Sequence, residues 1–232
     1  MKSTVKNIDL LFEDNHIIVV NKRSGDLVQG DKTGDAPLSD ILKEFIKVKY
    51  NKPGNVYLGV VHRLDRPTTG IVIFAKTSKA LERLNKMLRD KEIDKTYWAV
   101  VKNKPAKSKD TLVNYLKKNP KNNKATVFNK ETKDSKKAIL HYKILKALDN
   151  YQLLEIDLET GRHHQIRAQL SHIKCPIKGD LKYGFPRSNK DAGIHLHARR
   201  IQFTHPVSKE TIKIEAPTPK DPIWDACTQT KN

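Results

Sequence analysis

The stretch that decides the fold is VHRLDRPTTG, residues 61–70, and an apolar run at 71–75 follows it directly. It places Asp65 between Arg63 and Arg66 inside a turn. A carboxylate close to guanidinium groups stays ionised, because a nearby opposite charge favours its charged form. The stretch therefore predicts a loop between two strands that carries an anionic Asp65. By itself it fits a salt-bridged structural turn as well as a carboxylate that works among anionic ligands.

Two further stretches follow in the chain, DKTYWAVV at 94–101 and TGRHHQIR at 160–167. Together with VHRLDRPTTG they resemble, in order, the three motifs of RNA pseudouridine synthases of the RluA family. PIKGDLKYG at 176–184 and LHA at 196–198 are similar to that family as well. The resemblance spans nearly the whole chain. It implies an isomerase that converts uridine to pseudouridine in ribosomal RNA or tRNA, with an active cleft between two halves of a sheet.

The chain departs from the family pattern at three positions beside these motifs. Pro67 stands where an acidic residue is common, Thr69 where serine is usual, and His163 where threonine is usual. Pro67 is expected to stiffen the loop, because proline fixes its own φ and restricts the residue before it. The departures leave the proposed reactive residues in place and indicate a subfamily, with an RNA target of its own.

Charge and length limit the possible partners. The 232 residues include 45 Lys and Arg against 26 Asp and Glu, a net charge of +19. Such an excess is most simply explained by a polyanionic partner, and on charge alone RNA, DNA and anionic lipid all qualify. The length suits one domain or two closely fused halves. Because the catalytic pattern starts early, we expect residues 1–232 to be a single catalytic domain without the S4 RNA-binding domain of many relatives.

The sequence predicts a cytoplasmic protein. Cys175 and Cys227 lie far apart, so no disulfide framework is expected. Residues 1–13 lack the apolar core of a secretory signal, and the apolar runs are far shorter than the ~20 residues of a membrane helix. No membrane partner is expected, and a monomer is the default.

Apolar periodicity predicts an α+β fold with a mixed, mainly antiparallel sheet and flanking helices. Helices are expected from Ser39, as N-cap, to about Tyr50, over 78–89, and from Gly161 onwards, and the chain ends in a proline-containing tail with Trp224. Strands are expected at 8–12, 16–20, 60–61, 71–75, 95–101, 139–148, 152–158, 194–203 and 211–215.

Residues 102–137 change character and are rich in lysine and asparagine, with short apolar islands at 112–113 and 125–128. We interpret this segment as a hairpin-bearing excursion within the catalytic domain rather than as a linker. Its lysines would suit phosphate contacts, and a solvated edge hairpin fits the same composition.

The expected reaction makes one demand that Asp65 can meet. Pseudouridine formation breaks the bond between ribose C1′ and uracil N1, turns the base and joins C1′ to C5. Substrate and product are isomers, so we expect no cofactor and no metal. Asp65 is the candidate carboxylate at the sugar, either attacking C1′ or taking a proton at C2′ towards a glycal, and both routes stay open.

Four other residues are candidates for the site. Arg167 is expected at the rim of the core, where its guanidinium could hold Asp65 bidentately. Tyr97 offers a ring on which a flipped uracil can stack, and the resemblance also implies a role with the C5 proton. The resemblance implies that Arg63 enters the space left by the flipped nucleotide, although a phosphate contact fits equally. His62 is interpreted as structural.

Two other functions compete with the isomerase. The chain has many histidines, such as His163, His164, His195 and His197, but it lacks His-Glu-x-x-His and other zinc spacings, which disfavours a metal-dependent nuclease. A catalytically silent RNA-binding or ribosome-assembly protein of the same fold is the non-enzyme alternative. Tritium release from uracil C5 separates these functions, because it requires the chemistry and binding alone does not produce it.

Overall fold

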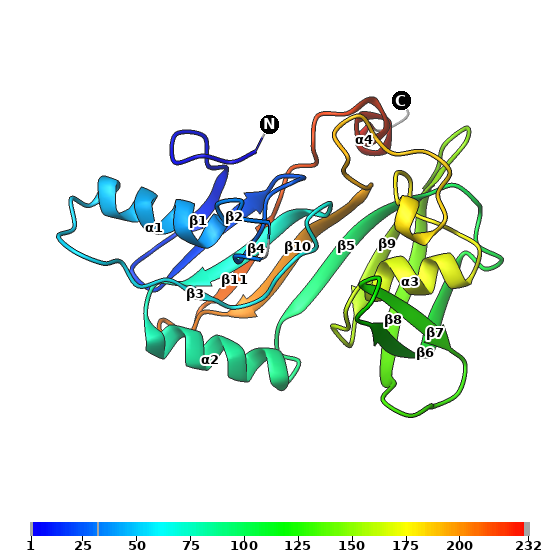
Figure 1. Ribbon diagram of the computed structural model, residues 1–232, viewed down its shortest axis with the longest axis horizontal. Helices are drawn as coiled ribbons and strands as arrows, with labels where there is room; N and C mark the ends of the chain where they lie inside the picture. Colours follow the sequence, from blue (N-terminus) through cyan, green and yellow to red (C-terminus); the bar gives the residue numbers. More distant parts are fainter. Residues whose placement is uncertain (1, 32, 230–232) are drawn as a thin grey trace. The chain divides into compact units, whose positions relative to one another are not determined.

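The computed structural model of the chain describes residues 2–31 and 33–229 (Figure 1). These residues form two compact units, one built from the described part of 1–95 with 198–218 and the other from 96–197 with the described part of 219–232. Each unit is a mainly antiparallel sheet with helices, so the expected α+β fold is confirmed. The expectation that the whole chain is one catalytic domain stays a prediction.

The sheet of the first unit is built around two buried strands, which pair antiparallel from Ile17↔Ala75 to Lys22↔Gly70. Its elements are β1 (Leu10–Glu13), β2 (Ile17–Lys22), α1 (Leu38–Lys49), β3 (Gly59–Val60), β4 (Thr69–Ala75), α2 (Ser78–Arg89) and β11 (Thr211–Glu215). β10 (Leu196–Thr204) enters this unit at Ala198 and pairs with β11. Ile18, Val20, Val72 and Phe74 of the central strands form a core with Leu42 and other residues of α1.

Gly70 lets β4 run directly against β10. Its φ of +109° is open to glycine and strained for other residues. A Cβ at this position would lie 2.4 Å from the backbone oxygen of Ala198. The glycine that ends the VHRLDRPTTG stretch therefore allows the start of β4 to lie close to the backbone of Ala198.

The second unit is a five-stranded antiparallel sheet in the order β5-β9-β8-β6-β7. Its core lies between the sheet and short helices, with Leu116, Ala138 and Ala168 in one cluster and Val100, Leu153 and Trp224 in another. Its elements are β5 (Asp94–Val101), β6 (Lys109–Asn119), β7 (Lys124–Phe128), β8 (Lys136–Ala147), β9 (Gln152–Leu158), α3 (Gln165–His172), the 3-10 helix η1 (Leu181–Tyr183) and α4 (Pro222–Thr228).

Three helix expectations are wrong. α1 begins at Leu38 after Pro37, and Ser39 lies buried inside its first turn instead of capping it. α3 begins at Gln165, not near Gly161, because the preceding residues form a turn that ends with His164 in the left-handed conformation. The tail around Trp224 is the helix α4.

The segment 102–137 holds the antiparallel pair β6 and β7, and β6 also pairs with β8 from Lys109↔Lys143 to Leu116↔Lys136. This hairpin is therefore a continuous part of the sheet of the second unit. Across the residues that the structure describes, no helix combines the length and apolarity needed to cross a bilayer.

Candidate active site

The loop with Asp65 connects β3 to β4, which pair with each other. The backbone oxygen of Asp65 accepts a hydrogen bond from the Thr68 nitrogen at 3.0 Å, which closes a turn. Thr68 and Thr69 are buried, Asp65 is half-buried and Arg63 is exposed. The loop is thus anchored at its C-terminal end, while Asp65 and Arg63 keep part of their surface exposed to solvent.

A buried lysine binds the backbone of this loop. The Nζ atom of Lys22 donates to the carbonyl oxygens of Arg23 at 3.0 Å, Arg66 at 3.0 Å and Thr68 at 2.7 Å. Only 1% of Lys22 is exposed. Burial lowers the pKa of Lys22 to about 7, and the nearby charges of Asp26 and Asp65 act in the opposite direction. Lys22 is not predictable from the sequence, because nothing in its neighbourhood shows that the side chain turns inward.

Arg66 has a different partner from the one that its position beside Asp65 predicts. Its guanidinium pairs with Asp35, whose carboxylate also binds Lys2 at 2.9 Å. The hydrogen bond from Lys2, with that from Arg66, lowers the pKa of Asp35. Arg66 therefore links the Asp65 loop to the segment that contains Asp35.

His62 is a structural residue, as its place beside the loop suggests. Its Nε2 atom accepts a hydrogen bond from the Ile73 nitrogen at 3.2 Å, which requires this nitrogen to be unprotonated. Burial lowers the pKa of His62 to about 3, and the charge of Lys95 acts in the same direction.

We expect His62 to make the protein sensitive to acid. The unfolded chain binds a proton at His62 below about pH 6.5, whereas the folded chain does so only near pH 3. The free energy of unfolding should therefore fall with decreasing pH between these values, by at most about 1.4 kcal/mol per pH unit. Urea unfolding at several pH values should show this slope in the wild type and a shallower one in His62→Gln. The exposed His172→Gln is the control; equal slopes in all three proteins would contradict the assignment.

Tyr97 lies near the start of β5 in the second unit. Its backbone is opposite Ile156 of β9, and 7% of the residue is exposed. Tyr97 is therefore largely buried, which is consistent with either a core residue or a surface for a base.

Arg167 is buried, and the expectation that it emerges at the rim of the core is wrong. Its Nε donates to Oδ2 of Asp180 at 2.7 Å and its Nη2 to Oδ1 at 2.9 Å. Arg167 is 5% exposed and Asp180 is 1% exposed. The charge is tolerated inside the protein because a buried carboxylate compensates it bidentately. Asp180 belongs to the KGDLKYG stretch. The similarity of this stretch to the family was the available signal for Asp180 in the sequence.

The turn before Arg167 is held by side chains. The Oε1 atom of Gln165 accepts from Thr160 Oγ1 at 2.8 Å and from the Arg162 nitrogen at 3.0 Å. The His164 Nδ1 atom lies 2.9 Å from the Tyr183 hydroxyl, and the His163 and His164 rings stack with centroids 3.8 Å apart. These contacts fix the start of α3, and with it the position of Arg167.

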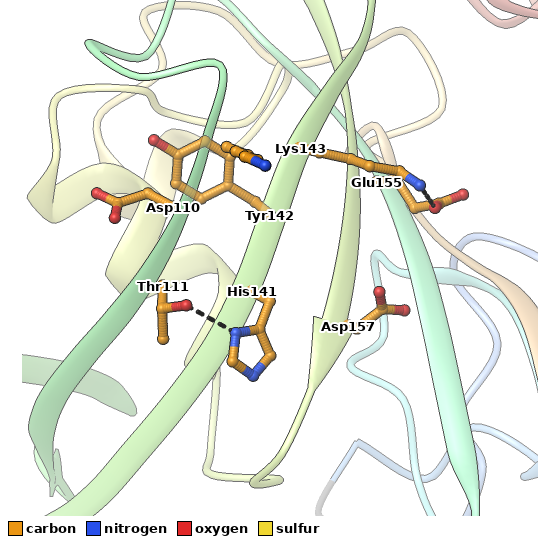
Figure 2. Close-up of a pocket in the computed structure, with 8 residues that line it drawn as sticks. Asp110, Thr111, His141, Tyr142, Lys143, Glu155 and Asp157 are labelled. Carbon is orange, nitrogen blue, oxygen red and sulfur yellow. Dashed lines mark hydrogen bonds and ion pairs between the residues drawn. The ribbon is translucent and has the colours of Figure 1, made fainter.

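A hollow of about 420 Å³ on the sheet of the second unit is a separate feature (Figure 2). Its polar side chains bind one another: Thr111 Oγ1 lies 2.8 Å from His141 Nδ1, and Lys143 lies 2.7 Å from Glu155. Neither Tyr97 nor Arg167 belongs to its lining, which consists of Lys109, Asp110, Thr111, His141, Tyr142, Lys143, Glu155 and Asp157. The hollow is therefore not the candidate active site.

The predicted site residues are divided between the two units. Asp65 and Arg63 belong to the first unit, and Tyr97 and Arg167 belong to the second. The contact between Asp65 and Arg167 stays a prediction. Within the described ranges no group of three or more histidine, cysteine, aspartate or glutamate side chains is arranged to hold a metal ion.

The fold and its three motifs define a class, the pseudouridine synthase fold. The RNA pseudouridylate synthase family matches residues 16–172. The chain is 36% identical to the ribosomal large subunit pseudouridine synthase C of Buchnera aphidicola, over 93% of this chain and 68% of that protein. It is 30% identical to the tRNA pseudouridine synthase C of Pectobacterium carotovorum, over 94% of this chain and 60% of that protein.

A solved structure shares the fold. The human RNA pseudouridylate synthase domain containing 4 superposes with a TM-score of 0.78 at 22% identity, covering 94% of this chain and 92% of that chain. The chain spans between 60% and 70% of the length of the curated relatives it matches. The chain belongs to the RNA pseudouridylate synthase family, whose members are isomerases, and the predicted resemblance is confirmed.

Proposed function

We propose that this chain converts a uridine in structured ribosomal RNA or tRNA to pseudouridine, with Asp65 acting at the ribose. The observation that carries the proposal is the loop geometry in a member of this family: Asp65 is half-buried and accessible, on a loop whose carbonyls are held by Lys22. A fixed carboxylate can approach the sugar without first ordering its own backbone, which lowers the entropic part of the barrier.

The other site residues have complementary roles in this proposal. The bidentate pair with Asp180 fixes the plane of the Arg167 guanidinium. A guanidinium fixed in this way can orient a second carboxylate, that of Asp65. Tyr97 supplies a ring and a hydroxyl for the flipped uracil, and the exposed Arg63 contacts the RNA at the vacated position or at a phosphate.

The names of the relatives support two substrate classes, ribosomal RNA and tRNA. One relative is named a ribosomal large subunit pseudouridine synthase and the other a tRNA pseudouridine synthase. Cys175 and Cys227 are free thiols, which fits the reducing cytoplasm in which we propose that the enzyme acts, as a monomer. Mapping pseudouridines in cellular RNA with and without the gene would identify the target.

The test is tritium release from RNA labelled at uracil C5. We expect the wild type to release tritium from cellular ribosomal RNA or tRNA, with the same rate in the presence of EDTA. Release from neither RNA, with binding retained, would favour the catalytically silent RNA-binding protein. An RNA-cleaving activity that EDTA abolishes would favour the nuclease.

We expect RNA binding to weaken steeply with salt. The segment 102–137 contains twelve lysines against three acidic residues and so carries much of the net charge of +19. Each phosphate that is neutralised releases counterions, so four or more contacts give a slope of about −3 or steeper for the logarithm of the affinity against that of the salt concentration. Fluorescence anisotropy across a salt series measures this slope. A flat response would contradict a basic RNA-binding surface.

A further inference from the structure

Tyr50, directly after α1, is an exposed aromatic residue surrounded by lysines. Its ring centroid lies 4.9 Å from the Nζ atom of Lys76, 5.2 Å from that of Lys49 and 6.0 Å from that of Lys52. The residue is 46% exposed. An exposed ring among cations is the arrangement that stacks on a base while the cations neutralise its phosphates.

A buried acid holds this cluster together. The carboxylate of Glu13 binds Lys49 at 2.6 Å, Lys76 at 2.8 Å and the Tyr50 hydroxyl at 2.9 Å. The Glu13 side chain is 6% exposed, whereas that of Lys49 is 41% exposed. The hydrogen bond to Glu13 raises the pKa of Lys49, which keeps it charged. The Glu13 carboxylate is therefore hidden from solvent, and the exposed surface of the cluster consists of the Tyr50 ring and positively charged lysines.

The cluster lies far from the catalytic loop within the same unit. β2 and β4 pair from Lys22↔Gly70, next to the loop, to Ile17↔Ala75, which Lys76 follows directly (Figure 1). Five residue steps at about 3.3 Å each separate the two ends by roughly 17 Å. A nucleotide at Tyr50 would therefore be a different one from the nucleotide that reaches Asp65.

We propose that Lys49, Tyr50, Lys52 and Lys76 form a secondary RNA site that stacks an unpaired base of the substrate on Tyr50. This inference rests on the proposed function for the identity of the partner. Lys76 is nearly buried, so it supports the ring, while the more exposed Lys49 contacts the phosphate backbone. The site would favour RNAs with a single-stranded or looped segment beside the modified nucleotide, because paired bases do not offer their faces.

The chain provides a matched control. Tyr57 belongs to the same unit and is 47% exposed, but the described residues place no lysine over its ring. Tyr50→Ala removes the ring, and Tyr50→Phe keeps the ring while it removes the bond to Glu13. Comparison of these two variants with Tyr57→Ala separates base stacking from the structural role of the hydroxyl and from a general effect of losing a surface tyrosine.

The experiment measures binding of a fluorescein-labelled uridine-rich single strand and of a fully paired duplex. We expect Tyr50→Ala to bind the single strand about fivefold more weakly or worse, since stacking on one base contributes that much. Tyr50→Phe and Tyr57→Ala should stay within about twofold of the wild type. Duplex binding should change little, and in the tritium assay KM should rise while kcat is kept.

Each alternative result is informative. An equal loss in Tyr50→Phe, or in Tyr57→Ala, would overturn the stacking site, and so would unchanged affinity in Tyr50→Ala when the wild type releases tritium. A wild type that releases no tritium, but whose single-strand binding depends on the Tyr50 ring, would overturn the proposed isomerase activity and leave this site standing. A wild type that binds neither RNA would overturn both.

Discussion

Tritium release from uracil C5 is expected to fall about a thousandfold or more when Asp65 is replaced by asparagine. The amide is the same size as the carboxylate, but it can neither attack C1′ nor take a proton from C2′. The turn should survive, because the Thr68 nitrogen bonds to the backbone oxygen of residue 65, which the substitution leaves in place. RNA affinity should therefore stay within about twofold of the wild type.

Asp40→Asn is the control for the loss of one negative charge in the same unit, because Asp40 is exposed on α1. It should release tritium at the wild-type rate. Near-normal release by Asp65→Asn would show that another group acts at the ribose. If Asp65→Asn lost both activity and RNA binding, a thermal unfolding curve would show whether the loop had collapsed, in which case the carboxylate chemistry would not be the cause.

The second large effect is expected at Asp180. Asp180→Asn removes the charge of the buried carboxylate that pairs with Arg167, and breaking a buried ion pair costs about 3 kcal/mol or more. Activity should fall as well, because the plane of the Arg167 guanidinium is no longer fixed. Urea unfolding measures the stability, and the tritium assay measures the activity under conditions in which the variant is folded.

Asp134→Asn is the matched control. Asp134 pairs with Lys117 in the same unit, but the two side chains are 67% and 44% exposed, so the loss should be about 1 kcal/mol or less. Equal losses in the two variants would mean that the pair of Arg167 with Asp180 is not a significant stabilising contact. A double variant, Arg167→Met with Asp180→Leu, should recover much of the stability and none of the activity, which separates the two roles of Arg167.

Several elements could be predicted because their signals are local. α2 covers Ser78–Arg89 and β11 covers Thr211–Glu215, as expected. The Thr77 hydroxyl accepts from the Ala80 nitrogen at 3.2 Å and caps α2, so its start is specified by neighbouring residues. α4 carried a comparable signal that was missed: Asp221 caps it, and Pro222 occupies its first turn.

The start of α3 was not predictable in the same way. The turn before it depends on Gln165, whose amide donates to the Ile139 carbonyl at 3.0 Å, and on His164, which contacts Tyr183. These partners come from β8 and η1, and a left-handed histidine shows no pattern of its own in the sequence. A helix whose first six residues are all buried also lacks the polar face on which periodicity depends.

The sequence alone determined the family, the α+β class and the aspartate in a strand-bounded turn. Motifs, turn residues and apolar periodicity each depend on residues that are close together in the chain. Tertiary structure alone decided which charges are buried and what compensates them. Asp180, which binds Arg167, lies 13 residues away from it in the sequence, and Thr68, which binds Lys22, lies 46 residues away. In the sequence, a lysine or arginine looks the same whether water or protein groups accept its hydrogen bonds. Only the folded backbone determines whether protein acceptors surround it.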